Sequence, residues 1–484
     1  MIHSERAFAL HSRYNPAGEA EKYVNALVFR EVPRFLILME PGRGYMIPLL
    51  ARKFPEAKII VIHAEAQESP DTPNLKIPPA VWEPACGVSL ERFLEQEIPD
   101  IEASAIRIIE WRPALALYGE AYRRLMAETV AVIKRLDANK RTTRTFGLRW
   151  FKNFFRILGA LRTVIYQAGP LTPAPCIVAG AGPSLEEAIP LIKGLKTRVP
   201  LLILGVSSGA MAFRERGLVP DLVIATDGGG WALLHLYEGL RGADRPFGLA
   251  VSLFSALPSQ AGDTPLLLIS DGSLWQRLIL KELNLPYISL VQRGTVTASA
   301  LDLAFSLTAG NVFIAGMDLS HRDIRTHARP YSFEGILEAK ASRFNPVYAQ
   351  TFTRSFGILT GGSYNIYADW FARQLTAYPQ RLYSLGENHP VFSSLKPWDA
   401  ADWKKAVPNP SFGIQRLSSE MPLVQQGADT LIRALIDPRT SEAIRRELGP
   451  LLFPDNDKED TTVEDLCNTI EHIAKAYTGN SYHG

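Results

Sequence analysis

The feature that most constrains this chain is the stretch PCIVAGAGPSL, residues 175–185. Its apolar run Cys176–Ala179 is typical of a buried strand, and Gly180 and Gly182 allow a sharp turn. Residues 185–195 then place apolar side chains on one helical face. A strand, a glycine turn and a helix N-terminus together favour an anion such as phosphate, because the N–H groups and the helix dipole point at it. A tight turn without a ligand explains the spacing equally well.

Composition sets limits on the rest of the chain. With 484 residues and 46% hydrophobic residues, we expect two to four domains with real cores. The net charge of +2 does not indicate an electrostatic attraction to nucleic acid or to a membrane surface. The cysteines Cys86, Cys176 and Cys467 are far apart, which favours a reducing compartment. The N-terminus lacks the apolar core of a signal peptide, and no stretch is long enough to span a membrane, so we expect a cytoplasmic protein.

The first 113 residues predict a Rossmann-like domain. Residues 34–40 and 58–63 have the composition of strands, with a glycine turn at 41–45 and a helix between them. The second strand ends near Glu65, and dinucleotide sites use an acidic residue at this place to hold a ribose. The glycine fingerprint is incomplete, which favours a structural domain over a working cofactor site.

A helical connector is predicted over residues 114–171. Its second part, 141–166, interleaves arginines and lysines with aromatic side chains. This pattern could bind a membrane surface or an acidic partner. We favour a helix that packs its aromatic stripe into a core and leaves its basic face in water.

Residues 172–390 predict a central α/β domain with an open, mostly parallel sheet. Apolar runs at 199–206, 222–226 and 311–315 predict strands that end at Ser207–Ser208, Asp227 and Asp318. Ligands bind at the carboxyl ends of strands in such sheets. Asp227 precedes three glycines, so it could equally cap its own loop.

Further polar residues lie near the strand predicted at 311–315, and residues 381–385 are predicted as the last strand of this domain. Thr295 and Thr297 precede or begin a helix, where they could cap it or contact a ligand. His327 follows Asp318 by nine residues, and the two form a candidate acid/base or binding pair, although a loop histidine is often simply exposed. Residues 391–484 predict a helical C-terminal domain.

Four segments together resemble a known family: GAGPSL at 180–185, LVPDLVIATD at 218–227, GTVTASALDLAFSLTAGNVFIAGMDLS at 294–320, and His327. The combination resembles the motility accessory factor (Maf) family, whose members include flagellin glycosyltransferases. It is similar to the domain that this family shares with archaeal 6-hydroxymethylpterin pyrophosphokinases. The G-x-GPSL element is also similar to that of bacterial sialyltransferases that use a CMP-sugar.

The resemblance implies transfer of a nonulosonic (sialic-like) acid from a CMP-sugar to a serine or threonine of flagellin. His327 would be the base, and Asp318 would orient its loop or bind the sugar. No metal is required, although a magnesium ion could use Asp227 as a ligand. The implied nucleotide site consists of Gly180, Ala181, Gly182, Pro183, Ser184, Leu185, Ser207, Ser208, Asp227, Thr295 and Thr297.

Two alternatives remain open at this point. A pterin pyrophosphokinase would use ATP and magnesium, with Asp227 and Asp318 as metal-binding carboxylates. A non-catalytic module would bind a nucleotide sugar or flagellin without transferring anything. The flanking domains favour the glycosyltransferase, because a kinase of small molecules needs no docking surface for a protein.

Overall fold

The computed structural model divides the chain into two compact units, Met1–Thr145 and Phe146–Gly484. The boundary falls inside the long helix α5 (Arg112–Ala160), and the finer division into four domains stays a prediction. The structure describes residues 10–65, 77–171, 173–241, 247–291, 293–322, 325–347, 349, 363–375, 378, 380–398, 412–417, 422–454 and 461–478. Residue 172, where we predicted the central domain to begin, lies outside them.

Unit 1 is built on a four-stranded parallel sheet in the order β3-β2-β1-β4. The two predicted strands are confirmed as β1 (Phe35–Met39) and β2 (Lys58–Ile62), and β3 (Ala80–Trp82) and β4 (Ile106–Glu110) complete the sheet. Helices α2 (Pro16–Ala26), α3 (Ile47–Lys53) and α4 (Leu90–Glu97) complete the unit. The Rossmann-like class predicted for this region is therefore confirmed.

The aromatic part of α5 lies in the core of unit 2. Phe151, Phe154 and Phe155 are fully buried, as predicted for a core-packing helix. The helix was expected to continue to Tyr166, and this prediction is wrong, because α5 ends at Ala160. The β-branched run that follows forms strand β5 (Thr163–Gln167), which joins the large sheet.

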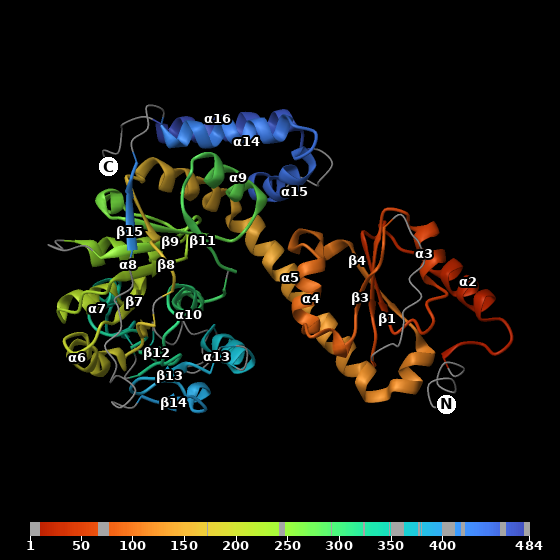
Figure 1. Cartoon of the computed structure of the whole chain (residues 1–484), viewed down its shortest axis with the longest axis horizontal. Helices are drawn as coiled ribbons and strands as arrows, with labels where there is room; N and C mark the ends of the chain where they lie inside the picture. The colour runs from red at the N-terminus through yellow and green to blue at the C-terminus, as the bar shows by residue number, and fades with distance from the viewer. Residues whose placement is uncertain are drawn as a thin grey trace. The chain divides into compact units, whose positions relative to one another are not determined.

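Unit 2 contains an eleven-stranded sheet in the order β14-β13-β12-β6-β7-β8-β9-β10-β5-β15, with β11 also beside β10 (Figure 1). All its strand pairs are parallel except β15 with β5. The predicted open, mostly parallel sheet is confirmed. Its remaining strands are β6 (Cys176–Ala179), β7 (Leu202–Val206), β8 (Leu222–Ala225), β9 (Gly248–Ser252), β10 (Leu266–Ser270), β11 (Tyr287–Ser289), β12 (Val312–Ala315), β13 (Leu382–Ser384), β14 (Lys396–Pro397) and β15 (Phe412–Arg416).

Alternate side chains of the central strands enter cores on opposite faces of this sheet. Ile177 and Ala179 pack with α6 (Leu185–Lys196) and α7 (Ala210–Glu215). Cys176 and Val178 point the other way, into a core that contains α10 (Val296–Leu307) and Phe371 of α13 (Ser363–Gln374). Burial on both faces explains why these strands read as continuous apolar runs.

The C-terminal region shares a core with the rest of unit 2. Helices α14 (Leu423–Ile436), α15 (Ser441–Leu452) and α16 (Val463–Thr478) pack with α5, α8 (Gly230–Leu240) and α9 (Leu274–Glu282). Their existence was predicted, but an all-helical tail was not correct, because β15 precedes them. Within the described residues, no helix is both long and apolar enough to cross a membrane.

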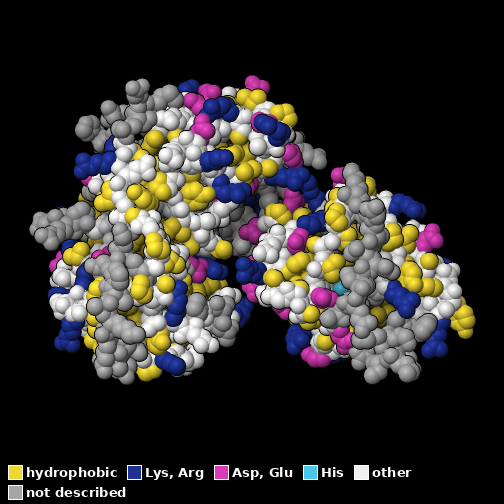
Figure 2. All heavy atoms as spheres, in the orientation of Figure 1, with side chains coloured by type: hydrophobic (Ala, Val, Ile, Leu, Met, Phe, Trp, Pro, Cys, Tyr) yellow, Lys and Arg dark blue, Asp and Glu magenta, His cyan; other side chains and the backbone are white. Residues whose placement is uncertain are grey.

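The charged side chains of unit 2 do not gather into one patch of a single sign on the face drawn in Figure 2. Lysines and arginines are scattered there among acidic, polar and apolar side chains. This distribution agrees with the small net charge of the chain.

Candidate functional site

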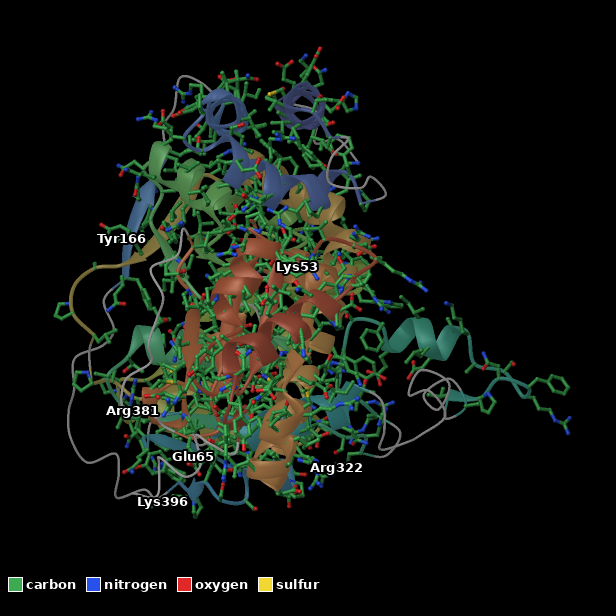
Figure 3. The ribbon with its side chains drawn as sticks, turned by 90° about the vertical axis from the view of Figure 1, so that its right-hand side faces the viewer. Lys53, Glu65, Tyr166, Arg322, Arg381 and Lys396 are labelled. Atoms are coloured by element: carbon green, nitrogen blue, oxygen red, sulfur yellow. The ribbon has the colours of Figure 1, made fainter. Side chains whose placement is uncertain are left out.

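The candidate site lies where the strand order of the large sheet reverses. The chain proceeds from β6 outward through β7, β8, β9 and β10, and then returns to place β12 on the other side of β6. Ligands of open α/β sheets bind at such a switch point, beyond the carboxyl ends of the strands. Arg322 follows β12 at this edge, whereas Arg381 precedes β13 at the opposite edge (Figure 3).

The glycine turn after β6 lies tightly against the turn after β12. The Gly180 and Gly182 N–H groups donate to the carbonyls of Ala315 and Gly316, both at 2.8 Å. A Cβ on Gly180 would lie 2.4 Å from the Gly316 oxygen, and one on Gly182 would lie 2.0 Å from Asp318 Oδ2. Both positions therefore require glycine, because the turn after β12 lies too close to leave room for a side chain.

Asp318 occupies the N-terminus of α6. Ser184 donates to Asp318 Oδ2 through its hydroxyl, at 2.7 Å, and its N–H lies 3.2 Å from both carboxylate oxygens. The N–H groups of Leu185, Glu186 and Glu187 donate to carbonyls within the same turn. The expectation that this turn offers its N–H groups to a phosphate therefore needs correction, because a carboxylate of the protein already holds that position. Which residues bind a nucleotide stays a prediction.

The Asp318 carboxyl has a raised pKa because it is partly buried. The hydrogen bonds from Ser184 and the charge of Arg322 oppose this effect of burial. The folded protein therefore binds the proton of Asp318 more tightly than the unfolded chain does. The stabilisation from this difference is complete below the pKa of the unfolded chain, near 4. It is lost as the pH rises through the higher pKa of the folded protein.

We expect Asp318→Asn to remove this part of the pH dependence. The stability of the wild type relative to the variant should fall as pH rises across that interval and then stay constant. Urea unfolding at a series of pH values measures the difference. A constant difference at every pH would show that Asp318 has an ordinary pKa.

His327 and the two serines after β7 lie around the same turn. The Ala328 N–H donates to the Ala181 carbonyl at 2.8 Å, which fixes the loop that carries His327. Ser207 is buried and Ser208 is half-buried in the 3-10 turn after β7. A Cβ on the next residue, Gly209, would lie 3.4 Å from the Gly180 carbonyl. Four of the predicted segments are thus brought together.

His327 belongs to an aromatic cluster that sequence reasoning missed. Its ring lies 5.7 Å from that of His235 on α8 and 5.5 Å from that of Phe333. Each histidine ring is oriented by a hydrogen bond between its Nδ1 and a hydroxyl group. His327 Nδ1 lies 2.7 Å from Thr326 Oγ1, and His235 Nδ1 lies 2.6 Å from Ser332 Oγ. The cluster connects the turn after β6 with the helix after β8.

Asn388 and His389 were also missed. Asn388 Oδ1 accepts from the Met317 N–H, and the His389 N–H donates to the Met317 carbonyl, both at 2.9 Å. These bonds fix the loop that carries Asp318. Burial lowers the pKa of His389, and the nearby Asp318 charge raises it in part. The sequence offered one signal for these residues, namely two adjacent polar side chains shortly after strand β13.

The other predicted residues lie at the same edge without a hydrogen bond to the turn among the described residues. Asp227 is exposed after β8, and its Oδ1 accepts from the Gly229 N–H at 2.8 Å, which is the loop-capping role considered above. Thr295 caps α10, where its side chain accepts from Ala298, and Thr297 lies in the first turn. Helix α10 packs on β6 and β7.

Two carboxylates considered as metal ligands are far apart in the sheet. Asp227 follows β8 and Asp318 follows β12, with β6 and β7 between these strands. Three strand spacings correspond to about 14 Å. Within the described ranges, no group of three His, Cys, Asp or Glu side chains is arranged to hold a metal ion.

In unit 1, the chain itself fills the equivalent crevice between β1 and β4. His11 Nε2 accepts from the Arg43 N–H at 3.1 Å, and a Cβ on Gly42 would lie 2.4 Å from the same nitrogen. The Trp111 indole N–H donates to the Leu10 carbonyl at 2.8 Å. This arrangement supports the interpretation of unit 1 as a structural domain.

Residues 149–323 match the family model described as 6-hydroxymethylpterin diphosphokinase MptE-like. We refer to this similar region as the MptE-like domain. The resemblance predicted from the motifs is thereby confirmed for the central region, and the MptE-like domain contains β6, β12 and the turns that meet between them.

Two further proteins are similar to this chain. An uncharacterized protein of Treponema pallidum (strain Nichols) is 27% identical over 314 residues, which are 64% of this chain and 66%, just under two thirds, of that protein. The structure of the MAf glycosyltransferase from Magnetospirillum magneticum AMB-1 aligns with a TM-score of 0.43 and 13% identity, over 99% of this chain and 78% of that one.

Proposed function

We propose that this chain is a glycosyltransferase that moves a nonulosonic acid from a CMP-activated donor to a serine or threonine of flagellin, and so supports flagellar motility. The observation that carries the proposal is the meeting of the GAGPSL turn, Asp318 and the His327 loop at the switch point of the MptE-like domain. We assign the docking of a protein acceptor to unit 1 (Met1–Thr145), a compact unit outside this domain.

In the proposed reaction, His327 takes the proton of the acceptor hydroxyl. The hydroxyl oxygen forms a bond with the anomeric carbon of the sugar, and the bond from that carbon to the phosphate oxygen breaks. CMP leaves with the electron pair. The Thr326 hydroxyl beside His327 Nδ1 holds the orientation of the imidazole, and Asp318 fixes the turn through Ser184.

The phosphate needs a different position from the one first predicted. Because Asp318 covers the start of α6, the N-terminus of α10 is the better candidate, with Thr295 as its N-cap and Thr297 in its first turn. In the described part of the chain, no atom lies within 4 Å of where a Cβ on Gly294 would be, which favours a ligand that approaches the backbone there. Ser207 and Ser208 would then line the sugar. The protein donors carry the phosphate charge, so the proposal requires no metal.

The second candidate is a magnesium- and ATP-dependent pterin diphosphokinase, which the description of the family model favours. The strand order is against a metal shared by Asp227 and Asp318, since two strands separate those that carry them. A third candidate is a module that binds nucleotide sugar or flagellin without catalysis. We place the protein in the cytoplasm, because Cys86, Cys176 and Cys467 are all free.

Ligand-dependent melting separates the three candidates. CMP at 100 times its Kd should stabilise the protein by about 2.7 kcal/mol, and ATP with magnesium should leave the melting temperature unchanged. The opposite result would support the kinase. Mass spectrometry of flagellin made with and without this protein then tests the transfer, and an unchanged flagellin mass would exclude it.

A further inference from the structure

The three glycines after Asp227 have different surroundings. A Cβ on Gly228 would lie 2.7 Å from the Phe254 carbonyl and 2.8 Å from the Trp150 ring, so packing requires this glycine. Among the described residues, a Cβ on Gly230 would meet no atom within 4 Å, and one on Gly229 would meet only the Asp227 carboxylate, with Oδ1 at 3.2 Å. Gly229 has an ordinary φ of −88°. Neither packing nor a positive φ explains Gly230 in the first turn of α8, where glycine is a poor helix former, whereas Gly229 is the N-cap of that helix, a position that glycine often occupies.

The backbone below these two glycines is held rigidly. The buried Asn153 of α5 donates to the carbonyls of Gly228 and Phe254, at 3.2 and 2.9 Å. The Ala256 N–H donates to the Asp227 carbonyl at 3.1 Å. The open backbone is therefore a fixed surface, such as a preorganised binding site needs.

Two side chains border the open backbone. The exposed Asp227 carboxylate is oriented by the Gly229 N–H and can accept further hydrogen bonds. Trp231 is 53% exposed, and its ring meets the buried Phe333 edge-on, with 5.4 Å between ring centroids. Phe333 also contacts His327, so this border adjoins the proposed base. We call residues 227–231 the glycine shelf.

We infer that the glycine shelf binds a planar pyrimidine ring that carries an amino group beside a ring nitrogen. The ring would approach the bare backbone of Gly229 and Gly230, contact the Trp231 indole, and donate its amino hydrogen to Asp227. Cytosine of CMP and the pterin ring both have this chemistry. The inference rests on the proposed function for its preferred ligand, CMP.

Gly230→Ala is the most direct test, because stability and binding should change in opposite directions. The methyl group meets no atom of the described residues, so the melting temperature should rise by about 2 °C through better helix propensity. The methyl group should obstruct the ring and weaken CMP binding at least tenfold in calorimetry. Gly194→Ala on α6 is the matched control, since it is equally unobstructed and should leave CMP binding unchanged.

Asp227 and Trp231 give a second test. Wild type should prefer CMP to UMP, because the uracil oxygen would face the carboxylate. Asp227→Asn should abolish this preference, and Trp231→Ala should weaken CMP binding about tenfold while Trp231→Phe retains most of it. Unchanged CMP affinity in Gly230→Ala and Trp231→Ala would overturn the inference.

The same variants separate failure of the shelf from failure of the proposed function. If wild type binds 6-hydroxymethylpterin but not CMP, the CMP-dependent function fails, and loss of pterin binding in Gly230→Ala would still support the shelf. If wild type binds neither ring, the shelf is overturned.

Discussion

Gly182→Ala should destabilise unit 2 by more than about 3 kcal/mol, because the new Cβ would lie 2.0 Å from Asp318 Oδ2 and 2.8 Å from the Gly316 carbonyl. The backbone oxygen cannot move without disturbing the hydrogen bonds between the two turns. Displacing Asp318 would also remove the cap on α6 that Ser184 shares. Urea unfolding followed by circular dichroism measures the loss.

The matched control for Gly182 is Gly194, nine residues beyond the start of α6. A Cβ there would meet no atom of the described ranges within 4 Å, so Gly194→Ala should be neutral or stabilising by up to about 1 kcal/mol. Equal effects of the two substitutions would show that the contact between the turns after β6 and β12 is not tight in solution.

His327→Ala should lower the rate of transfer by about 10²- to 10⁴-fold, the usual contribution of a general base. Binding of CMP should be retained, because the proposed base contacts the acceptor hydroxyl. Activity assays with flagellin, combined with calorimetry of CMP binding, measure both. His472→Ala on α16 is the control, because this exposed histidine lies outside the aromatic cluster.

A small effect of His327→Ala would give the residue a different role. If transfer falls less than tenfold while the protein loses stability, His327 acts through its contacts with His235 and Phe333, as part of the packing between α8 and its own loop. Asp318 would then be the remaining candidate for the base.

The central strands could be predicted because their burial is visible in the sequence. Segments such as Cys176–Ala179 and Val312–Ala315 are continuous apolar runs, since they are covered on both faces of the sheet. Strand β5 was read as helix because it directly follows a long helical stretch. Strand β15 has a mixed composition, and it pairs antiparallel with β5, about 250 residues earlier in the chain, where Gly413 leaves room for the Tyr166 ring.

The sequence indicated several residues of the candidate site, but it did not indicate how they contact one another. Ser184, Asp318 and His327 were singled out, and they do lie around one turn. That Asp318 would cover the start of α6 depends on the register of β12 beside β6, which no local pattern reports. His235 was missed because its role depends on a loop almost 100 residues later.

The return of β12 to the side of β6 has a consequence for biosynthesis. Strands β6 to β10 can pair one after another as the chain leaves the ribosome, but Asp318 arrives more than 130 residues after Ser184. A chain interrupted just before residue 311 would contain β5 to β11 and would still lack β12 and the turn that carries Asp318. The capacity to act on a ligand is therefore acquired in one late step, after most of the surrounding scaffold already exists.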